Sequence, residues 1–266
     1  EDGSYVQYNA SNGVVLSTGD ISYSDEYLEE FAPIALRVMT RLCSDRGNVG
    51  DGHNMAAWVG AKFQDGPWPT MMHPQAFAWF HGAFLFVNAE GKRFMCEDTW
   101  VQGKSLAINR QPGGYAWSLF DANWKEDLTA GLPYGGGMFW DSFRGFTDPI
   151  EAAAEYFDTQ IPTYIEQGIG LKADTLEEMA ELMGCPYETL KATVDRYNAM
   201  CEAGVDRDYY KKPIFLTPVK EGPFYATMVG PAILAITGGL KVDANFKLLN
   251  ANAQPIGGLY ALGNCM

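Results

Sequence analysis

Short apolar runs separated by glycine and turn residues fill the last part of the chain, residues 223–264. Three of these runs have the aromatic and β-branched composition of strands, and we expect strands at 224–228, 240–242 and 258–262. Gly238 and Gly239 lie between two runs, and the absence of two side chains lets another group approach the backbone closely. Gly263 and Asn264 follow the last run, at the end of a strand where open α/β sheets hold their ligands. A plain hairpin with packing glycines explains the same residues, so both interpretations stay open.

The first part of the chain shows strand-like runs followed by a helical period. Residues 5–17 fit two short strands joined at Asn12-Gly13, because this dipeptide favours the tight turn of a hairpin. Apolar residues recur at helical spacing over 26–42. Pro33 is expected to break or bend this helix, since proline lacks the backbone donor that a helix interior needs.

Two glycine-containing loops in this first part suit ligand contacts. Gly50, Asp51 and Gly52 precede a helical stretch, so backbone N–H groups there are expected to point at an anion before a helix N-terminus. Thr18 and Gly19 end a run of strand character. An ordinary glycine-rich helix start and a solvent-facing turn explain these two loops without a ligand.

Between residues 71 and 216 the pattern changes to a mixture of strands and helices. An apolar strand is expected at 83–87, followed by a hairpin turn over residues 88–91. Arg93 and Glu97 follow the turn and have opposite charges, and we interpret them as a structural ion pair.

Helices are expected to resume near residue 148. Asp148-Pro149 has the N-cap and first-turn proline with which many helices begin. Thr175 and Glu178 form a capping box for the next helix, and Gly184 suits the left-handed position after its end. A further helix carries apolar residues on one face, which is typical of packing against a core: Tyr187, Leu190, Val194, Tyr197 and Cys201.

Composition narrows the classes of partner. The chain has 266 residues, 47% of them hydrophobic, which suffices for a substantial core. Its net charge of −14 argues against nucleic acid and anionic membranes as partners, because both are negatively charged and bind clustered lysine and arginine. No apolar run approaches the ~18 residues of a membrane span. Five cysteines without a C-x-x-C pair, and three histidines, indicate reduced thiols and neither a metal site nor a disulfide framework.

Several segments together resemble a known family. They are VVLSTG at 14–19, GDG at 50–52, HP at 73–74, VN with GKRF at 87–94, and TGGL, VD and GLYALGN between 237 and 264. This set resembles the fumarate reductase/succinate dehydrogenase flavoprotein superfamily, which includes soluble fumarate reductases, urocanate reductase and 3-ketosteroid dehydrogenases. The resemblance covers nearly the whole chain and is most specific in its last third.

The resemblance implies an α+β fold with a discontinuous layout. Residues 71–216 would form a capping (substrate) domain inserted into two partial pieces of an α/β FAD-binding domain, residues 1–70 and 217–266. The N-terminal Rossmann unit would be absent and the C-terminus truncated. We therefore expect a fragment of a longer flavoprotein, which would be soluble and either cytoplasmic or exported.

The resemblance also implies FAD as the cofactor of the full-length protein. The matching residues lie in four loops: Thr18, Gly19, Gly50, Asp51, Gly238, Gly239, Gly263 and Asn264. Two positions depart from the family pattern, since Asp20 replaces a glycine and Val49 replaces a threonine. We expect the isolated chain to purify without tightly bound FAD.

For the chemistry, the resemblance implies reduction or formation of an activated carbon–carbon double bond in a small organic acid or enone. His73 matches a substrate-binding histidine, and Arg110 is a further candidate catalytic donor that no motif places. Val101 stands where fumarate reductases have their proton-donor arginine, and Ala235 replaces a substrate histidine, so fumarate is not expected to be the specific substrate.

Other functions and partners stay open. The alternatives are a non-catalytic, cap-bearing binding module and an enzyme similar to 3-ketosteroid dehydrogenases. A small-molecule substrate is expected in the catalytic case, with an electron-donor protein, a quinol or a cytochrome as the source of electrons.

Overall fold

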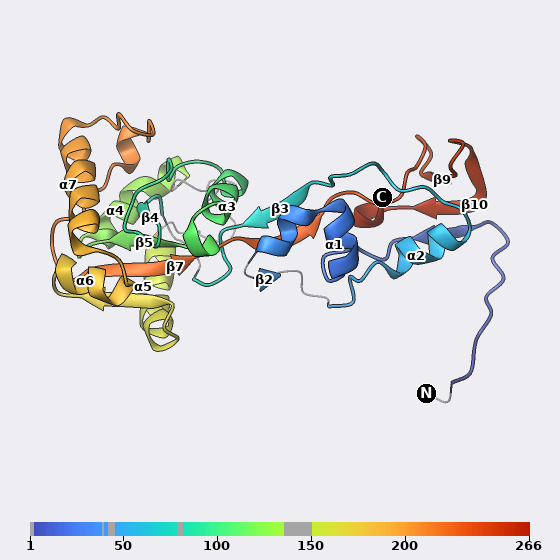
Figure 1. Cartoon of the computed structure of the whole chain (residues 1–266), viewed down its shortest axis with the longest axis horizontal. Coiled ribbons are helices and arrows are strands. Elements are labelled where there is room, and N and C mark those ends of the chain that lie inside the picture. Colours follow the sequence, from blue (N-terminus) through green and yellow to red (C-terminus); the bar gives the residue numbers. More distant parts are fainter. Residues whose placement is uncertain (1–2, 39, 42–45, 79–81, 136–150) are drawn as a thin grey trace. The chain divides into compact units, whose positions relative to one another are not determined.

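The computed structural model describes residues 3–38, 40–41, 46–78, 82–135 and 151–266. Helices and short strands mix along the described chain, which confirms the expected α+β class (Figure 1). The chain divides into two compact units. We call Glu1–Arg37, Arg41–Met71 and Ile233–Met266 the flanking unit, and Val38–Thr40 with Met72–Ala232 the central unit.

The flanking unit contains a three-stranded sheet in the order β1-β10-β9. β1 pairs in parallel with β10, and β10 pairs antiparallel with β9. Leu16, Leu240, Leu248 and Ala261 are buried together with helix α2 against this sheet. The elements of the unit are β1 (Val14–Leu16), α1 (Asp25–Phe31), η1 (Pro33–Arg37), α2 (Asp51–Trp58), β9 (Lys247–Leu249), β10 (Pro255–Ala261) and η6 (Gly263–Cys265).

Two sequence expectations in this unit are wrong in part. The hairpin at Asn12-Gly13 does not form, because β1 takes β10 as its partner and residues 5–10 contain no strand. The break at Pro33 is confirmed, but the helix does not continue to residue 42. α1 ends at Phe31, a short 3₁₀-helix follows, and Thr40–Arg41 forms strand β2.

The central unit is built on a four-stranded antiparallel sheet in the order β4-β5-β7-β6. Its elements are β4 (Leu85–Val87), α3 (Val101–Asn109), η2 (Pro112–Gly114), β5 (Ala116–Phe120), α4 (Trp124–Gly131), η3 (Leu132–Tyr134), α5 (Glu151–Glu166), β6 (Gly170–Ala173), α6 (Leu176–Met183), α7 (Tyr187–Ala203), η5 (Pro213–Phe215) and β7 (Phe224–Val229).

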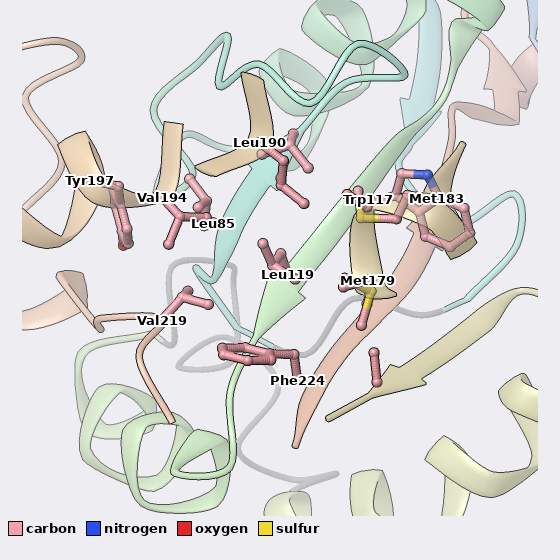
Figure 2. Packing of buried hydrophobic residues seen from close by; sticks show 14 of the residues in the cluster. Leu85, Trp117, Leu119, Met179, Met183, Leu190, Val194, Tyr197, Val219 and Phe224 are labelled. Carbon is pink, nitrogen blue, oxygen red and sulfur yellow. The ribbon is translucent and has the colours of Figure 1, made fainter. Parts of the chain in front are cut away.

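Helices cover both faces of this sheet. Successive side chains of a strand point to opposite faces, and β5 shows this with two neighbouring residues. Leu119 packs with α6 and α7, as Figure 2 shows, whereas Phe120 packs with α4 and α5. Strands β4 and β5 are therefore buried on both sides, whereas β6, at the edge of the sheet, has an exposed residue, Lys172.

Local signals in the central unit match the structure closely. Strand β4 and the turn after it are confirmed, with the Gly91 N–H donating to the Asn88 carbonyl. Thr175 caps α6, and Gly184 ends it with a φ of 72°. The apolar face of α7 is confirmed through its buried residues. The helix start expected at Asp148-Pro149 lies outside the described residues.

Strand β7 extends the central unit beyond the boundary drawn from the sequence. It pairs with β5 and β6, so this unit continues to Ala232 and past residue 216. A third sheet has the order β2-β8-β3, with β3 at Thr70–His73 and β8 at Ala232–Ile236. None of the described helices combines the length and apolar character that crossing a bilayer requires.

Candidate functional site

The residues expected to contact a ligand in the flanking unit follow two parallel strands. Leu16 of β1 lies opposite Ala261 of β10, and the Leu262 N–H donates to the Leu16 carbonyl at 2.9 Å. Because parallel strands end at the same edge, the loop with Thr18 and the loop with Gly263 leave the sheet side by side. This edge is where ligands of α/β sheets are commonly held.

The other two loops reach the same edge through close backbone approaches. A Cβ atom on Gly52 of α2 would lie 2.0 Å from Thr18 Oγ1, so the helix start packs directly on the loop after β1. A Cβ atom on Gly239 would lie 2.4 Å from the Cys265 carbonyl oxygen, and the Leu240 N–H donates to that oxygen at 2.9 Å. The structure thus brings all four loops together within one unit.

Exposure divides the expected contact residues into two groups. Thr18, Asp51, Gly263 and Asn264 are exposed, and Gly19 is half-buried. Buried within the unit are Gly50, Gly238 and Gly239. Only the first group is directly accessible to a ligand at this edge.

The buried glycines have a packing role that the sequence left open. A Cβ atom on Gly238 would lie 2.6 Å from the Trp68 ring, and one on Gly50 would lie 2.7 Å from the Tyr27 ring. Gly50 also has a φ of 87°, in the left-handed region that favours glycine, and it begins α2 without a side-chain cap. Their conformations and neighbours therefore require glycine even without a ligand.

Asp20, which replaces the family glycine, is a buried structural acceptor. Its carboxylate accepts hydrogen bonds from the Ser22 N–H at 2.9 Å, the Ser22 hydroxyl at 2.7 Å and the Ile236 N–H at 2.7 Å. The alternative of a solvent-facing turn is wrong at this position, since Asp20 is 1% exposed. The carboxylate instead joins the loop after β1 to strand β8.

His53 was not singled out from the sequence, although it directly follows the GDG motif. It is fully buried, and its ring lies 6.0 Å from those of Tyr27 and Trp68 and 6.1 Å from that of Phe63. Burial lowers its pKa to about 4, against a smaller opposing effect of Asp20. Neither ring nitrogen has a hydrogen-bond partner among the described residues. His53 is therefore neutral near pH 7.

The expected catalytic residues belong to the central unit. His73 is the last residue of β3 and is half-buried, and burial lowers its pKa although a hydrogen bond with Gln75 opposes this shift. Arg110 is exposed at the C-terminal end of α3. His73 thus offers a neutral imidazole at pH 7, and Arg110 a solvated cation.

Other residues of this unit that could donate a proton have different surroundings. Val101, at the family proton-donor position, is 1% exposed and packs with Phe86, Met95 and Ile108, so its position lies in an apolar core. Lys104 is completely buried, and Tyr115 packs against the core shown in Figure 2. The position of His81 lies outside the described residues.

The expected ion pair of Arg93 and Glu97 is confirmed and belongs to a larger buried group. Two Arg93 nitrogens donate to the Glu97 carboxylate at 2.7 Å, and Arg93 also donates to Asp206 at 2.7 Å. Burial alone would raise the pKa of Asp206, but the bonds from Arg93 and three backbone N–H groups outweigh it and lower the pKa to about 2. Lys211 lies 3.4 Å from Glu97 and donates to the Tyr197 hydroxyl at 2.6 Å. These contacts tie the segment before β7 to the turn after β4.

Comparison with known proteins places the chain among flavoproteins. A family model described as FAD binding domain matches residues 1–266. NADH:acrylate oxidoreductase of Vibrio harveyi is 28% identical over 98% of this chain and 24% of its own length. Fumarate reductase (cytochrome) of Shewanella frigidimarina is 28% identical over 95% of this chain and 40% of its own length. The 3-oxosteroid 1-dehydrogenase of Mycolicibacterium smegmatis is also 28% identical, over 96% of this chain and 47% of its own length.

Solved structures of a fumarate reductase and of a 3-ketosteroid dehydrogenase also match this chain. The open conformation of a flavocytochrome c3 fumarate reductase matches 96% of this chain and 41% of its own, with a TM-score of 0.64 and 26% identity. A 3-ketosteroid Δ1-dehydrogenase from Sterolibacterium denitrificans matches 99% of this chain and 49% of its own, with a TM-score of 0.72 and 23% identity, and so shows a similar fold. The chain spans less than half the length of each of these relatives.

Proposed function

Because this chain belongs to the FAD binding domain family, we propose that it forms part of a longer FAD-dependent oxidoreductase that acts on an activated carbon–carbon double bond. The superfamily resemblance drawn from the sequence motifs is confirmed by the family match and by the fumarate reductase and 3-oxosteroid dehydrogenase relatives. The observation that carries the proposal is the convergence of four loops at one edge of the β1-β10 sheet.

The flanking unit fits a role in holding FAD. Thr18 and Asn264 offer exposed hydrogen-bonding groups at the carboxyl ends of β1 and β10, where a ligand would meet the sheet. Asp51 lies in the first turn of α2, so a hydroxyl group that donates to its carboxylate suits this position better than a phosphate. In the oxidoreductase, FAD would supply hydride transfer, and the protein would supply orientation and the proton.

The exposure of strand β1 suggests that the flanking unit is part of a larger domain. Val14 and Val15 of β1 are 46% and 53% exposed. Parallel strands are normally covered on both faces, so this sheet suits further protein packed against it. We assign the flanking unit to the FAD-binding domain and the central unit to the capping domain.

The proposed substrate is an organic acid or enone less polar than fumarate. Apolar Val101 and Ala235 replace two family groups that bear or accept positive charge, and each charge-assisted contact contributes about 1.5–3 kcal/mol. Loss of two such contacts would weaken dicarboxylate binding by roughly two to four powers of ten. His73 would donate its ring N–H to a carbonyl or carboxylate oxygen of the substrate and so orient the reacting carbon.

One observation favours a second candidate, a binding module without catalysis. The Val101 position lies in an apolar cluster and offers no proton donor. Flavin absorbance together with turnover by the longer protein distinguishes the two, because a non-catalytic module would hold FAD or substrate without reducing an acrylate, fumarate or enone substrate.

The substitution His73→Ala tests the catalytic proposal in the longer protein. We expect kcat/KM to fall about tenfold if the lost hydrogen bond is to a carbonyl oxygen, and up to about a hundredfold if it is charge-assisted by a carboxylate, with the bound flavin unchanged. His73→Gln retains an N–H donor and should recover part of the loss. Unchanged kinetic constants in His73→Ala, or rapid reduction of fumarate by the unmodified protein, would contradict this account of the substrate site.

A further inference from the structure

A cleft on the central unit has a charge bias opposite to that of the whole chain. It has a volume of about 500 Å³, within the usual range for small-molecule sites, and lies beside α7. Four of its lining residues are cationic, namely Lys92, Arg93, Arg196 and Arg207, whereas Asp208 is its one acidic lining residue. The chain as a whole carries a net charge of −14.

Arg93 lines this cleft with a guanidinium that its neighbours hold in place. Its guanidinium lies 4.9 Å from the Tyr197 ring centre and 5.1 Å from that of Tyr209, and it bonds to Glu97 and Asp206. The Nη1 atom has no hydrogen-bond partner among the described residues. A guanidinium held in this way loses little conformational freedom when a ligand approaches.

Most of the other charges around the cleft are balanced in pairs. Arg196 bonds to Asp208, and Lys92 bonds to Glu90. The buried carboxylates of Glu97 and Asp206 balance Arg93 together with Lys211.

Arg207 is the cation left over by this pairing. It is exposed, and it has no ion-pair partner within the described part of the chain. The cleft therefore has one uncompensated positive charge, that of Arg207.

We propose that this cleft binds a small anion that carries phosphate or carboxylate groups. Arg207 and the neighbouring Arg196 and Lys92 donate to the anion. Tyr209, whose hydroxyl donates to the Arg93 carbonyl at 3.4 Å, forms part of the wall. None of the residues that line this cleft belongs to the loops assigned to FAD, and the proposal does not depend on that assignment.

Calorimetric titration of the chain with inorganic phosphate and with citrate tests the proposal. We expect a Kd near 1 mM at low ionic strength for at least one of these two anions. Binding should weaken as salt is added. Arg207→Gln should weaken binding at least fivefold, because it removes the unbalanced cation without removing an ion pair between described residues. Lys125→Gln removes the positive charge of an exposed lysine on α4, outside the cleft, and should leave the Kd unchanged.

The two probes and a second measurement make the outcome decisive. Preference for phosphate or for citrate identifies which group the cleft selects, and amide chemical-shift changes should concentrate at Thr193, Arg207 and Tyr209. Absence of binding by both probes, equal weakening by Arg207→Gln and Lys125→Gln, or shift changes centred elsewhere would overturn the proposal.

Discussion

Lys104 is a buried amine whose ionisation bears directly on stability. It is completely buried on α3, and burial lowers its pKa to about 7 from 10.5, with Lys211 adding to the shift. Glu97, Asp98 and Cys96 oppose it. Since the folded state binds this proton less readily than the unfolded state, stability contributed by the neutral amine is lost as the pH falls from about 10.5 to about 7.

Replacing Lys104 with Met should therefore stabilise the chain near neutral pH. The variant keeps most of the side-chain volume but removes a group that costs roughly 1.4 kcal/mol per pH unit across this window. Thermal unfolding should show a higher Tm for Lys104→Met than for the unmodified chain at pH 7. This difference in Tm should become smaller towards pH 10. Lys125→Met, at an exposed lysine of α4, is the control and should show no such pH dependence. An equal or lower Tm for Lys104→Met at pH 7 would contradict this description of Lys104.

At the scale of elements, the junction between the loop after β8 and η6 depends on one glycine. The backbone at Gly239 has no left-handed φ, so alanine is excluded there by space and not by conformation. A Cβ atom would lie 2.4 Å from the Cys265 carbonyl oxygen and 2.8 Å from His53 Nε2. The backbone atom cannot move aside as a flexible side chain could.

The substitution Gly239→Ala should destabilise the flanking unit by about 1–3 kcal/mol, as overpacking of a close contact does. Gly257→Ala is a matched control, because Gly257 lies in β10 with no atom within 4 Å of the added Cβ and no left-handed φ. Urea unfolding measures both. Equal stability of the two variants would show that the close approach at Gly239 does not constrain the fold.

The elements that could be predicted from the sequence are those specified by local chemistry. Thr175 and Gly184 bound α6 as expected, because caps depend on residues a few positions apart. The partner of β1 could not be predicted in this way, since β10 is distant in the chain and the turn signal at Asn12-Gly13 competes locally. The same holds for the site. The sequence motifs predicted which loops form the site. The burial of Gly238 and the role of Asp20 could not be predicted, because they depend on contacts with residues distant in the chain.

At the scale of the whole molecule, the two units differ in how the chain builds them. The central unit consists of one long segment, Met72–Ala232, and the short segment Val38–Thr40, and its described residues include the buried apolar cluster in Figure 2. The flanking unit is assembled from three chain segments, and its residues 3–12 contain no helix or strand and are exposed.

Limited proteolysis should reflect this difference. We expect the first cleavage within residues 1–20, and helices α6 and α7, residues 176–203, to survive longer because their buried faces contribute to the core of the central unit. The segment 205–220 should also be protected in part, because Asp206 and Lys211 are buried in the ion network. Mass spectrometry of the fragments identifies the sites, and early cleavage within α6 or α7 would contradict the packing described.

We propose that the exposed loop residues at the edge of β1 and β10 hold FAD in the longer protein. The most direct measurement is the flavin absorbance per protein of Asn264→Ala, compared with Asn252→Ala, an exposed asparagine in the turn between β9 and β10. The account predicts about tenfold weaker FAD binding for Asn264→Ala, as expected for the loss of one buried hydrogen bond to the ligand, and full flavin content for Asn252→Ala. Equal flavin content and equal FAD affinity in the two variants would contradict it.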